Sequence, residues 1–205
     1  MKIIFLLILL LLCNCSTQAA EIKSGDIVFQ ITETDRSKAI QLASHSKYTH
    51  MGIVVFIKKE PLVFHASSIT IFEPFKEWID SGIDKHFVIK RLKSYPNGFN
   101  KENEVKLNEV IQRFVGLPYD DYYEISDERM YCSELIWKIY KNFLNIEIGK
   151  LRKLSEYGIE HYEVKEKLKQ YVGERLSYEE LIISPGDMFN SNLVFTINGD
   201  LLPKN

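Results

Sequence analysis

The chain has 205 residues, of which 45% are hydrophobic and 26% are charged, and these values are typical of a soluble globular domain. Its 26 Lys and Arg residues against 28 Asp and Glu residues give a net charge of −2. No basic excess is available for broad nucleic-acid binding, so we expect no nucleic-acid partner. The apolar fraction excludes a disordered chain, and the single long apolar run excludes a polytopic membrane protein. The length favours one folded domain, which we place at residues 21–205.

Residues 1–20 have the pattern of a signal peptide. Ten consecutive apolar residues, 3–12, are too few to span a bilayer but match the length of a signal-peptide core. Small residues just before Glu21 favour ordinary cleavage there, whereas an imperfect lipobox would make Cys15 or Cys13 the lipidated first residue. A retained anchor is the third reading. We expect export to the periplasm or cell envelope, either as a free protein or as a membrane-anchored lipoprotein through Cys15.

Export gives the cysteines a particular meaning. Two of the three cysteines lie in or beside the targeting segment, so Cys132 is the only one in the folded body and no disulfide can form within that body. A lone thiol in an oxidising compartment is either buried and inert or kept because its reactivity is used. Both readings remain open until the neighbours of Cys132 are considered.

The first half of the body is rich in short strand patterns. Residues 50–57 are dominated by β-branched and aromatic side chains, and the tetrapeptide 58–61 suits a hairpin connection. The other predicted elements are a turn and strand at 25–30, a short helix at 37–43, a returning strand at 62–67, its continuation at 69–72, a helical turn at 75–79 and a strand at 86–92.

The second half is helical. Leu107, Val110, Ile111 and Phe114 follow the i, i+3, i+4, i+7 spacing of an amphipathic helix. The longest helical pattern begins at Cys132, and it ends at Leu144. The remaining predictions are a polar loop at 120–129, a charged and weakly helical, solvated insertion at 150–175, and extended segments at 181–185 and 193–195.

Cys132 in the first turn of its helix indicates nucleophile chemistry. Free N–H groups and a partial positive charge at a helix start favour the thiolate, so we predict a pKa below the usual value of about 8.5. The same amides can donate hydrogen bonds to an oxyanion. A cysteine hydrolase also needs an imidazole as base, and His50 begins a strand from which it can reach the thiol. A hairpin that opposes Ile57 to Leu62 leaves His65 four residues out of register with His50, close enough for His65 to orient the base.

Structural and metal-binding roles for the histidines are the alternatives to the catalytic hypothesis. A single histidine at a strand start is more often a hydrogen-bonded structural residue than a catalytic one. Zinc binding through His45, His50 and His65 is conceivable, but the sequence has no HExxH, no CxxC and no tight carboxylate cluster. We therefore predict no metal and no other cofactor.

Several blocks, in the same order, resemble the YiiX/YebB-like family, a circularly permuted branch of the papain-like NlpC/p60 superfamily of cysteine hydrolases. The matching blocks are residues 25–30, 38–43, 48–54, 116–120, 131–138 and 183–185. The resemblance implies an α+β, permuted papain-like fold, in which an antiparallel barrel-like sheet packs against a helix that carries the nucleophile cysteine at its N-terminus.

The resemblance also implies roles for residues of this chain. Cys132 would be the nucleophile and His50 its base, and Tyr119 in the Gly-x-Pro-Tyr motif would lie beside the active site. We add Tyr131 and Ser133, the neighbours of the cysteine, as candidate substrate-binding residues. Relatives often carry Glu in the Val-Phe-x-Ala block where this chain has His65. Other branches use His as the third polar residue, so His65 can keep the orienting role, although it stabilises an imidazolium less than a carboxylate does.

The expected function is that of an exported cysteine hydrolase. It would cleave an amide bond in peptides or cell-wall peptides through a Cys132 acyl-enzyme. One alternative is an acyltransferase or lipid-ester hydrolase of the lecithin retinol acyltransferase type, acting on a lipid acyl substrate. The other is a non-catalytic module that binds peptides or amino acids. Nothing in the sequence indicates the oligomeric state.

Overall fold

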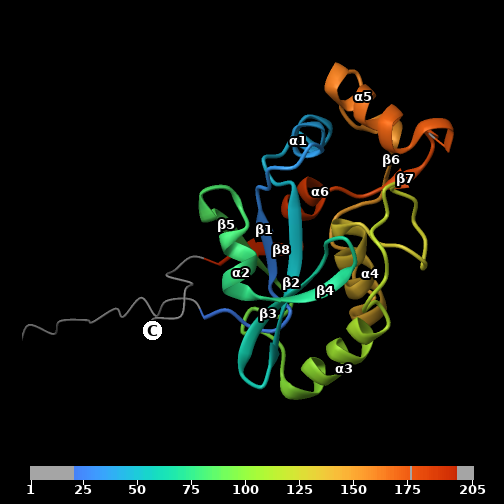
Figure 1. Ribbon diagram of the computed structural model, residues 1–205. Coiled ribbons are helices and arrows are strands. Elements are labelled where there is room, and N and C mark those ends of the chain that lie inside the picture. Colours follow the sequence, from blue (N-terminus) through green and yellow to red (C-terminus); the bar gives the residue numbers. More distant parts are fainter. Residues whose placement is uncertain (1–20, 176, 198–205) are drawn as a thin grey trace, which may run out of the picture.

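The computed structural model describes residues 21–175 and 177–197 (Figure 1). The predicted targeting segment, with Cys13 and Cys15, lies outside the described residues. Within them, no helix has both the length and the apolar character needed to cross a membrane.

The main sheet is antiparallel throughout and has the strand order β4-β3-β2-β1-β5-β8. Short runs of β-branched residues joined by tight turns produce such a sheet, because antiparallel neighbours need no long crossover. The strands are β1 (Ile27–Gln30), β2 (His50–Ile57), β3 (Glu60–Ala66), β4 (Thr70–Pro74), β5 (Phe87–Leu92) and β8 (Val194–Thr196).

Helices cover both faces of this sheet. Figure 1 shows α4 and α2 on opposite sides of the central strands. The helices are α1 (Ser37–Ser44), α2 (Phe75–Asp80), α3 (Lys101–Gln112), α4 (Cys132–Leu144), α5 (Tyr162–Tyr171) and α6 (Pro185–Phe189), and a second small sheet pairs β6 (Arg152–Lys153) with β7 (Leu181–Ile182). The α+β class expected from the sequence, with an antiparallel sheet packed against the helix that begins at Cys132, is confirmed.

The two layers follow from alternation along β2. Met51, Ile53 and Val55 point into the larger core, which also contains Cys132 and the apolar face of α4. Val54 points the other way, into a smaller core with Trp78 of α2. Because successive side chains of a strand face opposite sides, one β-branched run supplies both cores.

The β2–β3 hairpin is tighter than the sequence predicts. Ile57 pairs with Glu60 rather than with Leu62, so the connection consists of Lys58 and Lys59 alone. Both lysines have positive φ, 52° and 72°, as a two-residue turn of type I′ requires. The predicted four-residue connection was wrong, because this pair of lysines lacks the Gly or Asn that normally marks such a turn.

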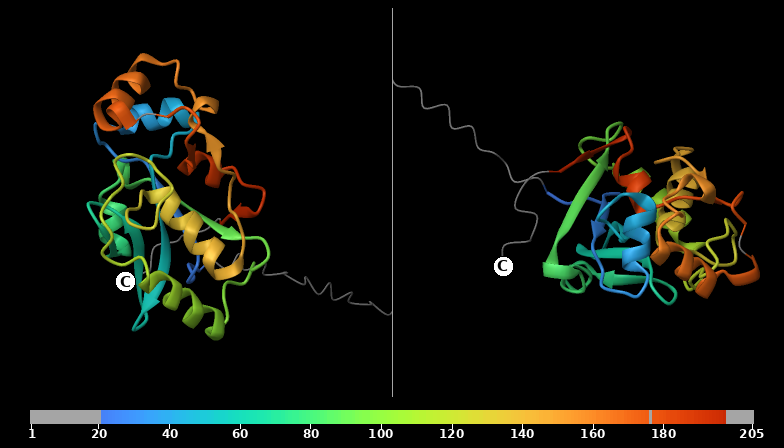
Figure 2. Two further views of the ribbon diagram at one scale, coloured as in Figure 1. Left: turned by 90° about the vertical axis from the view of Figure 1, so that its right-hand side faces the viewer. Right: turned by 90° about the horizontal axis from the view of Figure 1, so that it is seen from above.

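The region after residue 150 also differs from the prediction. Residues 150–175 do not form a solvated insertion: α5 packs against α1, and Figure 2 shows the two helices lying together at one end of the molecule. Residues 181–185 are only partly extended, because Pro185 opens α6, whose start is capped by the side chain of Ser184 bonding Asp187 N. A Ser-Pro-x-Asp pattern is a helix-start signal, and it was missed in the sequence.

A buried ion pair joins Asp26, the residue before β1, to Arg91 of β5. Arg91 donates from Nε to Asp26 Oδ1 (2.7 Å) and from Nη2 to Asp26 Oδ2 (2.8 Å), and both side chains are almost fully buried. Arg91 Nη2 also donates to the Glu21 carbonyl (2.8 Å), and Lys23 N donates to Asp26 Oδ2 (2.8 Å). This pair fixes the turn that precedes β1 and thereby the strand that lies beside β2.

Candidate active site

The start of α4 is held by a buried carboxylate. Glu134 accepts hydrogen bonds from the backbone N–H groups of Ser126 (3.1 Å) and Tyr131 (3.4 Å), and Lys138 Nζ lies 3.2 Å from its Oε1. Tyr131 is therefore the residue that caps the helix, and Cys132 is the first helical residue, with 5% of its surface exposed. The thiol thus sits at the helix start, as the sequence predicts.

The electrostatics of this thiol differ from the prediction. Burial raises the pKa of Cys132 to about 11, although the backbone N–H of Met51 and the groups of Ser133 act in the opposite direction. The prediction of a lowered pKa was wrong, because removal from water outweighs the partial charge of the helix start. At neutral pH the thiol is protonated.

The two predicted histidines meet. His50 Nε2 lies 2.9 Å from His65 Nδ1, at hydrogen-bonding distance. The shorter hairpin brings them together, because it leaves the two residues two positions out of register instead of four. Trp78 stacks on the His50 ring, with ring centroids 6.0 Å apart, and meets the His65 ring edge-on at 6.4 Å. This fully buried indole covers the imidazole pair.

Both imidazoles are neutral at neutral pH. Burial lowers the pKa of His50 to about 3, with a further contribution from His65, and burial lowers the pKa of His65 to about 4. A carboxylate that the sequence did not indicate stands behind them, since Glu73 Oε2 on β4 lies 2.9 Å from His65 Nε2. Glu73 Oε2 does not lie along the Nε2–H direction of His65, so among the described residues His65 Nε2 has no well-aligned hydrogen-bond acceptor.

The thiol lies near the start of β2. The N–H of Met51, the residue after His50, faces the Cys132 sulfur. No hydrogen bond joins the Cys132 thiol to an imidazole within the described part of the chain. His50 Nε2 is engaged with His65, so Nδ1 is the His50 nitrogen that this contact leaves free.

The three predicted substrate-binding residues differ in their bonding. Tyr131 accepts a hydrogen bond from Ile183 N (3.1 Å), and Ser133 donates one to Ile183 O (2.8 Å), so both hydroxyls hold the chain before α6. Tyr119 is brought to the site by a bridge to Met130, and burial raises the pKa of its hydroxyl well above the usual value. All three line the same pocket as Cys132.

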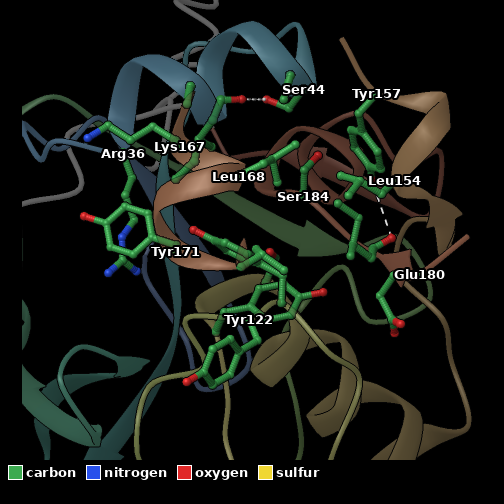
Figure 3. A pocket seen from close by; sticks show the side chains of 18 of the residues that line it. Arg36, Ser44, Tyr122, Leu154, Tyr157, Lys167, Leu168, Tyr171, Glu180 and Ser184 are labelled. Atoms are coloured by element: carbon green, nitrogen blue, oxygen red, sulfur yellow. Dashed lines mark hydrogen bonds between the residues drawn. The ribbon is translucent and has the colours of Figure 1, made fainter. Parts of the chain in front are cut away.

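That pocket has a volume of ≈ 120 Å³ and opens on the thiol. Figure 3 shows Tyr171 and Leu168 of α5 projecting into it, with Arg36 and Tyr122 on neighbouring walls. The apolar side chains that line it include Ala39, Ile40, Ala43, Leu154, Val164 and Leu168. Residues 150–175 are therefore a wall of the site, not a solvated appendage.

Tyr123 is a pocket residue that sequence reasoning missed. Its φ of 60° lies in the left-handed region, which is unfavourable for a bulky side chain. Asp120 stabilises this backbone by accepting hydrogen bonds from the N–H groups of Tyr122 (2.9 Å) and Glu124 (2.7 Å). Burial raises the pKa of Tyr123 to about 12. The Asp120 in the polar loop was the available signal, because Asp commonly caps such turns.

A cysteine at the start of a helix, packed on an antiparallel sheet that carries a histidine earlier in the chain, is the arrangement expected of permuted papain-like enzymes. A family model described as "Permuted papain-like amidase enzyme, YaeF/YiiX, C92 family" matches residues 21–197. The chain belongs to this family of hydrolases.

Two relatives support the assignment. YiiX of Escherichia coli strain K12 is 38% identical over 192 residues, which cover 94% of each chain. A crystal structure of YiiX from Escherichia coli O157:H7 superposes with a TM-score of 0.82 at 37% identity, and the match covers 88% of this chain and 98% of that one.

The crystallised YiiX is described as a metalloprotein. The described residues of the present chain contain no group of three or more His, Cys, Asp or Glu side chains placed to hold a metal ion. His50 Nε2 and His65 Nδ1 are 2.9 Å apart, closer than the roughly 3.3 Å that two nitrogens sharing a tetrahedral zinc would keep. The site geometry of this chain therefore does not fit a metal, and no chemical step is assigned to one.

Proposed function

We propose that the protein is an exported cysteine amidase that cleaves an amide bond in peptides or cell-wall peptides. Membership of the amidase family supports the reaction class. The observation that carries the proposal is the pairing of His50 with His65 beside the strand start that the Cys132 thiol contacts.

The reaction begins from neutral groups. His50 Nδ1 takes the proton of the thiol as Cys132 Sγ attacks the carbonyl carbon of the substrate. The N–H groups of the first turn of α4, which have no partner within the helix, donate hydrogen bonds to the oxyanion. The imidazolium then returns its proton to the leaving amine, and water hydrolyses the acyl-enzyme with His50 again acting as base.

Mass-spectrometric screening of peptides, muropeptides and acyl esters tests this proposal. Turnover by the wild type should disappear in Cys132→Ala, and His50→Ala should lose about 10³-fold or more, because groups of one catalytic unit fail together. His65→Ala should cost less, and His65→Glu should restore or raise activity by supplying a carboxylate partner. Turnover that survives in Cys132→Ala would contradict the mechanism. Tight retention of a peptide without turnover would favour the binding-module reading.

The character of the pocket favours a second candidate, a lipid acyl substrate of the acyltransferase or lipid-ester hydrolase type. The walls beside the thiol are mostly carbon, supplied by α1, α5 and the segment around Leu154. An extended hydrocarbon chain buries against such a surface without unsatisfied polar groups. The same screen separates the two candidates. Only an enzyme that acts on lipid acyl groups would release free fatty acid or transfer the acyl group to an added amine.

Export is also part of the proposal, supported by the signal-like apolar run. Intact-mass measurement of periplasmic and membrane fractions should find either a chain that begins near Glu21 or one lipidated at Cys15. A full 205-residue chain in the cytoplasm would overturn both versions.

A further inference from the structure

Glu73 lies outside the set of residues that the sequence or the family resemblance assigns to the reaction. It stands on the edge strand β4, and its side chain is 31% exposed. Its Oε2 lies 2.9 Å from His65 Nε2, on the side of that ring opposite the nitrogen that meets His50. Three ionisable side chains are thus connected in the order His50, His65, Glu73.

Heavy-atom distances allow two opposite arrangements of protons in this chain of contacts. In one arrangement His50 Nε2–H donates to His65 Nδ1, and His65 Nε2–H faces the Glu73 carboxylate. In the other arrangement His65 Nδ1–H donates to His50 Nε2, and the unprotonated His65 Nε2 faces Glu73. A neutral imidazole carries one N–H and one lone pair, so the state of each nitrogen fixes the state of the other.

Only the first arrangement leaves His50 able to act as a base. With the proton on Nε2, Nδ1 of His50 keeps its lone pair and can take the thiol proton. In the second arrangement Nδ1 of His50 carries the proton and cannot accept another. Burial keeps both rings neutral, so the choice of tautomer, and not the charge, decides whether the base is competent.

An ionised carboxylate favours the competent arrangement. Facing Glu73, a protonated His65 Nε2 is attracted, whereas a lone pair at 2.9 Å from a carboxylate oxygen is repelled. The partial exposure of Glu73 gives its carboxylate room to rotate onto the N–H axis.

We infer that Glu73 is a positioning residue that selects the Nε2–H tautomer of His65 and, through it, the proton-accepting form of His50. The inference rests on the proposed role of His50 as the base. It also explains how a histidine can serve as orienter. The Glu73 carboxylate sets the tautomer of His65, and His65 in turn sets the tautomer of His50.

Imidazole ¹⁵N NMR of the purified protein tests the inference without any substrate, because protonated and unprotonated ring nitrogens have widely different shifts. In the wild type, the proton of His65 should be on Nε2. In Glu73→Gln, whose amide can both donate and accept, it should be shared between the two nitrogens. Glu60→Gln, an exposed carboxamide substitution on β3, is the matched control and should leave the spectrum unchanged. A proton on Nδ1 of His65 in the wild type, or an unchanged tautomer in Glu73→Gln, would overturn the inference.

A double-mutant cycle gives the functional readout. Glu73→Gln should lower kcat/KM about tenfold in the wild type, the size expected for loss of a charge-assisted contact. In the His65→Glu background it should cost nothing, because the new carboxylate contacts His50 directly. A merely structural Glu73 would cost the same in both backgrounds, and that result would refute the relay. If the tautomers shift as expected but no Cys132-dependent turnover exists, the proton relay stands and the proposed function fails.

Discussion

Alkylation of Cys132 tests whether burial or the helix start controls the thiol. Because burial raises the pKa of Cys132 to about 11, the thiolate fraction near neutral pH is about a hundredfold or more below that of an ordinary thiol, equivalent to about 3 kcal/mol against ionisation. Labelling with iodoacetamide should therefore be about a hundred times slower at pH 7 in the folded protein than in urea, and its rate should rise steadily through pH 10.

The shape of the pH profile separates ionisation from access. A buried thiol that is merely hard to reach would label slowly but with an ordinary midpoint, so the midpoint, and not the absolute rate, is the quantity to compare. His50→Ala should leave that midpoint unchanged, because both groups are neutral at rest. A rate that is already constant from pH 6 upward, and that loses this plateau in His50→Ala, would show a thiolate–imidazolium pair and refute the reasoning.

Three other substitutions have expected outcomes. Asp26→Ala should lower the free energy of unfolding by about 3–5 kcal/mol in urea titrations, because it leaves Arg91 buried without its carboxylate; a change near zero would contradict this. In Gly52→Ala the new Cβ would lie 2.3 Å from Val63 Cγ1, so the buried Val63 side chain or the β2–β3 pairing must shift, and both Tm and activity should fall; wild-type values for both would argue against the close packing. Tyr171→Ala should raise KM with little change in kcat, because it removes a pocket wall remote from the thiol chemistry; an unchanged KM for every substrate would exclude α5 from binding.

Elements with a strong local pattern could be predicted from the sequence to the residue. The strand β2 and the helix α4 begin and end where their periodicity indicates, and together they carry His50 and Cys132. The hairpin between β2 and β3 was wrong by two positions, because its register depends on the backbone of Lys58 and Lys59 and not on their side chains.

Features that depend on tertiary contacts could not be predicted. Residues 150–175 have few apolar side chains, and the ones that wall the pocket, such as Leu168, do so only because α5 packs on α1. Glu73 has no motif of its own and meets His65 through the pairing of β3 with β4. The pKa of Cys132 depends on how deeply the thiol is buried, and burial cannot be predicted from the position of a residue in its helix.

The pairing of β5 with β8 has a consequence for biosynthesis. Leu92 and Val194, which face each other across this pair, are 102 positions apart in the chain. Contacts between such distant segments form late, because a long loop must close before they stabilise the sheet. A polypeptide cut between α4 and β8 would keep the histidines and the cysteine but leave β5 as a bare edge, open to pairing with other chains. Degradation products and unfinished chains are therefore expected to aggregate instead of persisting as free, active fragments.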